Sequence, residues 1–79
     1  MERYNKGMNL RVETEQEEDG RWIAEVPELP GVLAYGTSHD QAVAYAKALA
    51  LRVIAERLEH GEEVPDMANL FSVPAWPKA

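Results

Sequence analysis

The sequence predicts one α+β domain whose elements follow the order β-β-β-α-β over its 79 residues. Residues 8–16 and 21–26 alternate apolar and polar side chains, which is the period of a strand with one buried face. Residues 38–59 repeat apolar side chains at the spacing of an amphipathic helix. A chain of this length builds only a small core, and such domains commonly gain stability by associating.

The first two predicted strands form a hairpin. In the first, the side chains expected on one face are Met8, Leu10, Val12 and Thr14. Residues 1–7 are an expected flexible N-terminus, with Met8 as an alternative start. A polar turn at 17–20 leads to the second strand, where Trp22 belongs to the expected core face with Ala24 and Val26. Antiparallel pairing is expected across so short a turn.

Residues 27–31 end the second strand, because Pro27 and Pro30 fix φ and remove two backbone donors. Gly31 allows the chain to reverse. The favoured interpretation of this segment is a rigid turn. The functional alternative is that it presents Glu28 and Leu29 to a partner.

A third strand is predicted at 32–35 and ends at Gly36. It is apolar at every position, so both of its faces are expected to need cover.

The predicted helix follows Ser38, which with Gln41 forms a capping box. His60 and Gly61 are its expected end. The apolar positions expected to face the sheet are Ala42, Val43, Ala46, Leu49, Ala50, Val53 and Leu58. Alanines at 42, 44, 46, 48, 50 and 55 are expected to allow a close approach to the sheet.

Beyond the helix, residues 62–69 are interpreted as a linker and 70–73 as a fourth strand. Pro74 and Pro77 favour an edge position for that strand, because proline cannot serve a central ladder. A right-handed crossover would lay it beside the first strand and parallel to it.

Charge and composition limit the function classes. The chain has 14 acidic and 8 basic residues, a net charge of −6, and no cysteine. Nucleic-acid-binding domains present a basic face, whereas the basic residues here are scattered. No apolar run approaches the roughly 20 residues that span a bilayer. We therefore expect a cytoplasmic protein that binds neither nucleic acid directly nor membrane, and that holds no cofactor.

One stretch of sequence resembles a known family. Residues 21–31, RWIAEVPELPG, combine Trp22, Ala24 and the PELPG turn, and Gly36, the cap Ser38 and Gln41 follow at a fixed spacing. This arrangement closely resembles the signature of HicB-like antitoxin domains, over residues 8–60.

The resemblance implies a partial ribonuclease-H-like β-β-β-α-β fold and the role of neutralising HicA, a small basic toxin that cleaves messenger RNA. It also implies a homodimer or homotetramer. Family members often add a DNA-binding segment. None is expected here, because residues 62–79 are few and include Pro65, Pro74 and Pro77.

A nuclease related to ribonuclease H is the enzymatic alternative, and it needs several carboxylates that converge on two divalent cations. Glu13 and Glu15 lie on the polar face of the first strand, and the acids of the helix are scattered. His39 and His60 lie at opposite ends of the helix and cannot share a metal ion. We therefore expect no catalytic residue and no metal site.

Two groups of residues are candidate contacts for a partner. Ile23 shares the polar face of its strand, and with Leu33 or Tyr35 it would form an exposed apolar patch that mediates homodimerisation. The acidic Glu17, Glu18 and Asp19 are either a solvated hairpin tip or a docking point for a basic partner.

The leading functional hypothesis is an antitoxin-type module that covers the RNA-binding face of a HicA-like toxin. The alternative is a solitary, self-associating structural or regulatory protein without a toxin partner.

Overall fold

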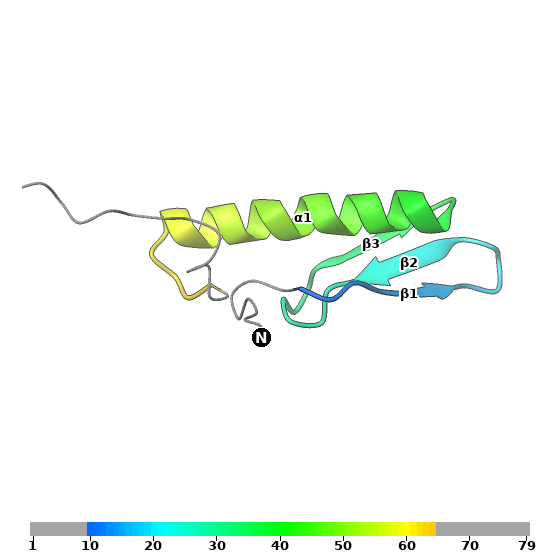
Figure 1. Ribbon diagram of the computed structural model, residues 1–79, viewed down its shortest axis with the longest axis horizontal. Helices are drawn as coiled ribbons and strands as arrows, with labels where there is room; N and C mark the ends of the chain where they lie inside the picture. Colours follow the sequence, from blue (N-terminus) through cyan, green and yellow to red (C-terminus); the bar gives the residue numbers. More distant parts are fainter. Residues whose placement is uncertain (1–9, 65–79) are drawn as a thin grey trace, which may run out of the picture.

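The computed structural model describes residues 10–64, which form three strands followed by one helix (Figure 1). The strands are β1 (Glu13–Gln16), β2 (Trp22–Glu25) and β3 (Leu33–Gly36), and the helix is α1 (His39–Glu59). The sheet order is β1-β2-β3, with both pairs antiparallel. This confirms the predicted α+β class and meander. The predicted fourth strand at 70–73 and the N-terminus at 1–7 lie outside the described residues.

Register in the sheet follows from its two turns. Gly20, at φ 93°, closes the β1–β2 hairpin, where the Glu17 amide donates to the Arg21 carbonyl at 2.7 Å. Gly31, at φ 92°, lies in the turn between β2 and β3. The Val26 amide then donates to the Val32 carbonyl at 3.0 Å, which extends the pairing beyond β2. Both glycines adopt a backbone conformation that side chains with a Cβ disfavour.

The first strand is shorter than predicted. Regular pairing begins at Glu13, although Leu10 and Val12 still pack against the core. Thr14, expected on the buried face, is exposed, because α1 lies over β2 and β3 and contacts β1 much less. The alternating pattern therefore predicted the correct face of this strand but not how far the helix covers it.

Capping fixes both ends of α1. The Gln41 amide donates to Ser38 Oγ at 3.1 Å, as the capping motif predicts. The Gln41 side chain does not close the reciprocal bond to Ser38, since its Oε1 instead accepts from the Thr37 amide at 2.7 Å. His60 is the C-terminal cap, and Gly61 follows at φ 71°. The predicted helix boundaries are confirmed.

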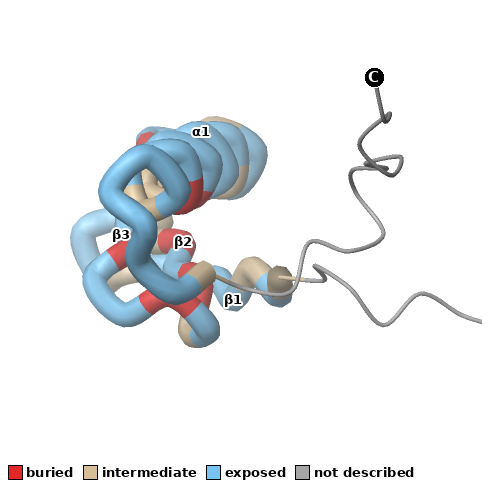
Figure 2. The backbone as a smooth tube through the Cα atoms, turned by 90° about the vertical axis from the view of Figure 1, so that its left-hand side faces the viewer, coloured by how far each residue is buried: buried red, intermediate tan, exposed pale blue. Residues whose placement is uncertain are grey.

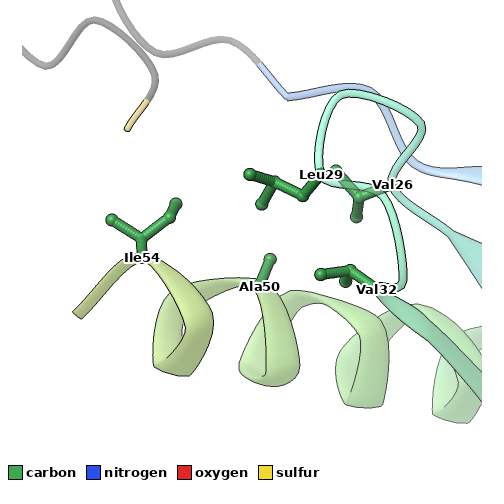
Figure 3. Packing of buried hydrophobic residues seen from close by; sticks show 5 residues of the cluster. All are labelled: Val26, Leu29, Val32, Ala50 and Ile54. Atoms are coloured by element: carbon green, nitrogen blue, oxygen red, sulfur yellow. The ribbon is translucent and has the colours of Figure 1, made fainter. Parts of the chain in front are cut away.

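The core lies between one face of the sheet and the inner side of α1 (Figure 2). One cluster joins the turn after β2 to the second half of the helix, and Figure 3 shows its side chains facing one another: Val26, Leu29, Val32, Ala50 and Ile54. A second cluster, nearer the hairpin tip, consists of Ala24, Ala42 and Ala46, each with no exposed surface. Small side chains therefore set the spacing of the two layers at this end.

The orientation of α1 corrects part of the sequence analysis. Ala42, Ala46 and Ala50 face the sheet as expected, but Ala44, Ala48 and Ala55 are exposed. Leu58, assigned to the buried face, keeps 50% of its surface exposed. Ile54, which the periodicity did not assign to the buried face, is buried instead. The helix contains too many apolar residues for periodicity alone to separate the two sides.

Gly36 lies where β3 comes closest to the helix. A Cβ atom at this position would be 2.5 Å from the Ala42 nitrogen and 2.9 Å from the Ala42 Cα. Both are backbone atoms of the first helical turn, so neither can rotate away. The glycine is thus required by contact between β3 and α1.

We predict that Gly36→Ala destabilises the domain by about 1–3 kcal/mol, because the clash separates β3 from α1. Urea unfolding followed by circular dichroism measures this loss. Gly20→Ala is the matched control, since a Cβ there meets nothing within 4 Å and only the positive φ is strained. Equal stability of Gly36→Ala and the wild type would show that the two elements do not approach so closely.

Candidate protein-binding surface

The face of the sheet opposite α1 has no covering layer within residues 10–64 (Figure 1). Register places its side chains in two rows across the strands. One row is Glu13, Glu25 and Leu33, and the other is Glu15, Ile23 and Tyr35. These six residues are called the outer sheet face below.

Apolar side chains occupy the β2–β3 half of the outer sheet face. Leu33 is 40% exposed and Tyr35 is 43% exposed, while Ile23, in the central strand, is half-buried between its neighbours. The predicted patch of Ile23 with Leu33 and Tyr35 is thus present on one surface. Leu33 and Tyr35 point away from the helix, so this face of β3, which was expected to need cover, has none within residues 10–64.

Carboxylates occupy the β1 half of the same face. Glu13 lies directly opposite Glu25, and Glu15 lies opposite Ile23. A groove between these strands is lined by Glu13, Glu15, Ile23 and Glu25, with Thr14 at its edge. Within residues 10–64, Glu13 pairs with Arg11 at 3.1 Å, whereas Glu15 and Glu25 form no ion pair. The facing pair Glu13 and Glu25 is unfavourable, since like charges opposite each other on a sheet repel.

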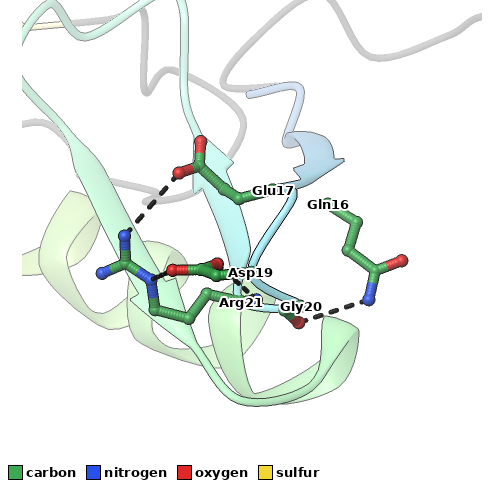
Figure 4. Close-up of polar contacts among 5 residues, drawn as sticks. All are labelled: Gln16, Glu17, Asp19, Gly20 and Arg21. Carbon is green, nitrogen blue, oxygen red and sulfur yellow. Dashed lines mark hydrogen bonds and ion pairs between the residues drawn. The ribbon is translucent and has the colours of Figure 1, made fainter.

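Arg21 organises the hairpin tip beside this face (Figure 4). Its Nε donates to Asp19 Oδ2 at 2.9 Å, and its Nη2 lies 3.7 Å from Glu17 Oε1. The guanidinium carbon also lies 4.7 Å from the centre of the Tyr35 ring, a cation–π distance. Arg21 therefore joins two of the predicted acidic contacts to one of the predicted apolar contacts. Gln16 completes the tip by donating to the Gly20 carbonyl at 3.2 Å.

The pKa of Asp19 is lowered, first because the Arg21 backbone amide donates to its Oδ1 at 3.0 Å, and then because of the Arg21 charge. Asp19 is thus held as a charged acceptor and belongs to the turn itself. Glu18, in the same turn, is exposed and makes no ion pair within residues 10–64.

The turn at 27–31 sends Glu28 and Leu29, both candidate partner contacts, to different environments. Leu29 is 1% exposed and packs in the core, so its assignment as a partner contact is wrong. The turn packs against the second half of α1, at Ala50 and Ile54, where an apolar side chain closes the core. Glu28 points outward, and its Oε2 accepts from Arg11 Nε at 3.0 Å.

Arg11 and Glu28 connect the start of β1 to this turn across 17 positions of sequence. The Arg11 side-chain hydrogen bond holds the pKa of Glu28 below its usual value. Glu28 is therefore ionised near neutral pH and stabilises the turn. Sequence reasoning missed Arg11 and Arg21 as organising residues, because strand alternation alone does not show which acids they reach.

The other residues of the HicB-like signature contribute to the fold. Trp22 is half-buried, and its ring meets His39 edge-on with centroids 5.3 Å apart. Pro27 is half-buried at the start of the turn. Pro30 and Gly31 line a pocket with Val53, Arg57 and His60 near the end of α1. These residues shape the fold, and none lies on the outer sheet face.

Within the described part of the chain, no three His, Asp or Glu side chains are placed to hold a metal ion. The same residues include no helix long and apolar enough to cross a membrane. Comparison of the chain with protein-family models, curated proteins and solved structures gives no match. The support for the candidate surface therefore comes from the charge and exposure of its own residues.

We predict that acid weakens the link between Arg11 and Glu28. A carboxylate with a lowered pKa stabilises the fold above its unfolded pKa of about 4, and this contribution is lost as pH falls through the lower folded value. Thermal unfolding midpoints from pH 7 to pH 2 should therefore fall less steeply for Glu28→Gln than for the wild type. The Glu18→Gln control should retain the wild-type slope. Parallel curves for wild type and Glu28→Gln would contradict the assigned pairing.

Proposed function

We propose that this chain is a protein-binding module of the antitoxin type, which captures a small basic protein on its outer sheet face. The observation that carries the proposal is the combination, on one uncovered surface, of an apolar patch with a block of carboxylates. Protein interfaces commonly pair an apolar centre with a polar rim.

Charge favours a basic partner. The outer sheet face carries Glu13, Glu15 and Glu25, and the adjoining tip adds Glu17, Glu18 and Asp19. Three of these six carboxylates already pair with Arg11 or Arg21, which leaves Glu15, Glu18 and Glu25 without an ion pair within residues 10–64. A basic surface approaching this face would relieve the repulsion between Glu13 and Glu25, and long-range attraction would accelerate its encounter.

Apolar contact supplies the rest of the binding free energy. Leu33 and Tyr35 expose large side chains next to Ile23, and burial yields about 25 cal/mol per Å² of apolar surface. Tyrosine is a frequent hot-spot residue, and Arg21 already holds this ring in place. We propose Ile23, Leu33 and Tyr35 as the anchors and the carboxylates as the steering groups.

The resemblance of residues 21–41 to HicB-like domains suggests which basic protein is bound: a HicA-like toxin that cleaves messenger RNA. Such a toxin presents a basic surface to RNA, so an acidic module that covers this surface would exclude the substrate. The module performs no chemistry itself. In this proposal the fold is the partial ribonuclease-H-like one, with residues 70–73 as a fourth strand parallel to β1.

The alternative is a self-associating structural or regulatory protein without a toxin. The exposed edge of β3 favours it, since an edge strand can pair with a second copy. The acidic outer sheet face favours the basic partner instead, because two copies of it repel each other.

We predict that a neighbouring gene encodes a short basic protein that this chain binds, and that Leu33→Ala weakens this binding by at least tenfold in Kd, a typical hot-spot loss. Calorimetric titration measures this change. Leu51→Ala, which truncates an exposed leucine of α1, is the matched control and should leave Kd unchanged. Replacing Glu15 and Glu25 by glutamine should slow association and reduce its dependence on salt.

Failure of the wild-type chain to bind that protein at low salt would overturn the antitoxin proposal. Binding that survives Leu33→Ala but is lost in Leu51→Ala would place the partner on the helix and exclude the outer sheet face.

A further inference from the structure

One cation lies beside the outer sheet face, although that face is proposed to bind a basic protein. Side-chain alternation places Arg21 on the same side of the sheet as Ile23 and Glu25. Ile23 lies directly opposite Tyr35, so Arg21 is a diagonal neighbour of that ring, within reach of a long side chain. By charge alone, an arginine at this position opposes the approach of a basic partner.

Two carboxylates of the hairpin tip hold the head group of Arg21 and balance its charge (Figure 4). Its Nε donates to Asp19 Oδ2 at 2.9 Å, and its Nη2 lies 3.7 Å from Glu17 Oε1. The two contacts use different nitrogens of a rigid, planar group, so they restrain the plane of the guanidinium as well as its position. An approaching basic protein therefore meets an arginine whose charge is already compensated.

The restrained guanidinium in turn restrains the Tyr35 ring. Its carbon lies 4.7 Å from the ring centre, and the tyrosine is 43% exposed. An exposed side chain loses rotational freedom when a partner covers it, and this loss weakens affinity. A ring that a cation already holds in place loses less freedom on binding.

We propose that Arg21 is a positioning residue of the binding surface, which holds the Tyr35 ring ready for the partner and so strengthens binding of a basic protein despite its own positive charge. This role rests on the proposed function. Its effect is opposite in sign to that of charge alone. Removing a cation from an acidic chain should strengthen its attraction for a basic protein, whereas removing Arg21 should weaken binding.

The turn around Arg21 should survive loss of the arginine side chain, because its backbone bonds remain. The Glu17 amide donates to the Arg21 carbonyl at 2.7 Å, and the Gly20 amide donates to the Glu17 carbonyl at 2.9 Å. The Arg21 amide donates to Asp19 Oδ1 at 3.0 Å. Variants at position 21 therefore test the contact with the ring and leave the hairpin formed.

The first test uses the full chain without a partner. In proton NMR, the ring current of Tyr35 should shift the Arg21 side-chain protons upfield, and Tyr35→Leu should abolish this shift. Asp19→Asn should reduce it, because it removes the charged acceptor of Nε but keeps an oxygen for the Arg21 amide. Glu18→Gln, the same change of charge in the same turn, should not alter it. Equal positions of these protons in the wild type and in Tyr35→Leu would overturn the proposal.

The second test is calorimetric titration with the short basic protein expected from a neighbouring gene. Arg21→Met should raise Kd about two- to fivefold, the range of an exposed cation–π contact. Arg21→Lys keeps a charge near the ring and should recover part of this loss. Arg52→Met, which removes the same charge from the exposed side of α1, should leave Kd unchanged or lower it. In the Tyr35→Leu background, Arg21→Met should no longer weaken binding.

The outcomes separate this role from the proposed function. If the wild type binds the basic protein and Arg21→Met binds it equally well or more tightly, charge alone governs position 21 and the positioning role is wrong. Equal weakening by Arg21→Met with and without the Tyr35 ring would also contradict it. A wild type that binds no basic protein would remove the proposed function and the binding role of Arg21 together, and the NMR result would still decide whether Arg21 holds the ring.

Discussion

Contact between alanine side chains of α1 and the sheet determines the spacing on which the other features depend. Ala24 of β2 and Ala42 and Ala46 of α1 are completely buried, and Gly36 admits the helix backbone to the end of β3. The two layers approach closely because these positions lack larger side chains. Leu29, Val26 and Val32 then close the wider end of the same core.

This close contact leaves two surfaces with opposite character. Within residues 10–64, α1 covers one face of the three-stranded sheet and leaves the other uncovered, and the side of α1 that does not meet the sheet is exposed. The outer sheet face combines its apolar patch with carboxylates, whereas the outward side of α1 exposes Leu51 and Leu58. A small domain with little core thus has two surfaces by which association can add stability.

Much of this structure could be predicted from local sequence. The turns at Gly20 and Gly31 and the cap at Ser38 each depend on neighbours in the chain, and all were confirmed. Strand alternation predicted the three strands but not the exposure of Thr14. The predicted patch of Ile23, Leu33 and Tyr35 also follows from alternation once the strands pair.

What sequence could not show depends on contacts between distant segments. The burial of Leu29 follows from the way its turn folds over α1, and the ion pair of Arg11 with Glu28 joins segments that only folding brings together. The inward and outward alanines of α1 could not be separated, because apolar residues occur on every side of that helix.

The rotation of α1 about its own axis is the central claim, since it decides which of its alanines enter the core. Ala46→Leu and Ala48→Leu test it most directly when their free energies of unfolding are compared. The close contact predicts a loss of about 1–3 kcal/mol for Ala46→Leu and a change within about 0.5 kcal/mol for Ala48→Leu. Equal losses, or a larger loss for Ala48→Leu, would contradict the orientation of the helix.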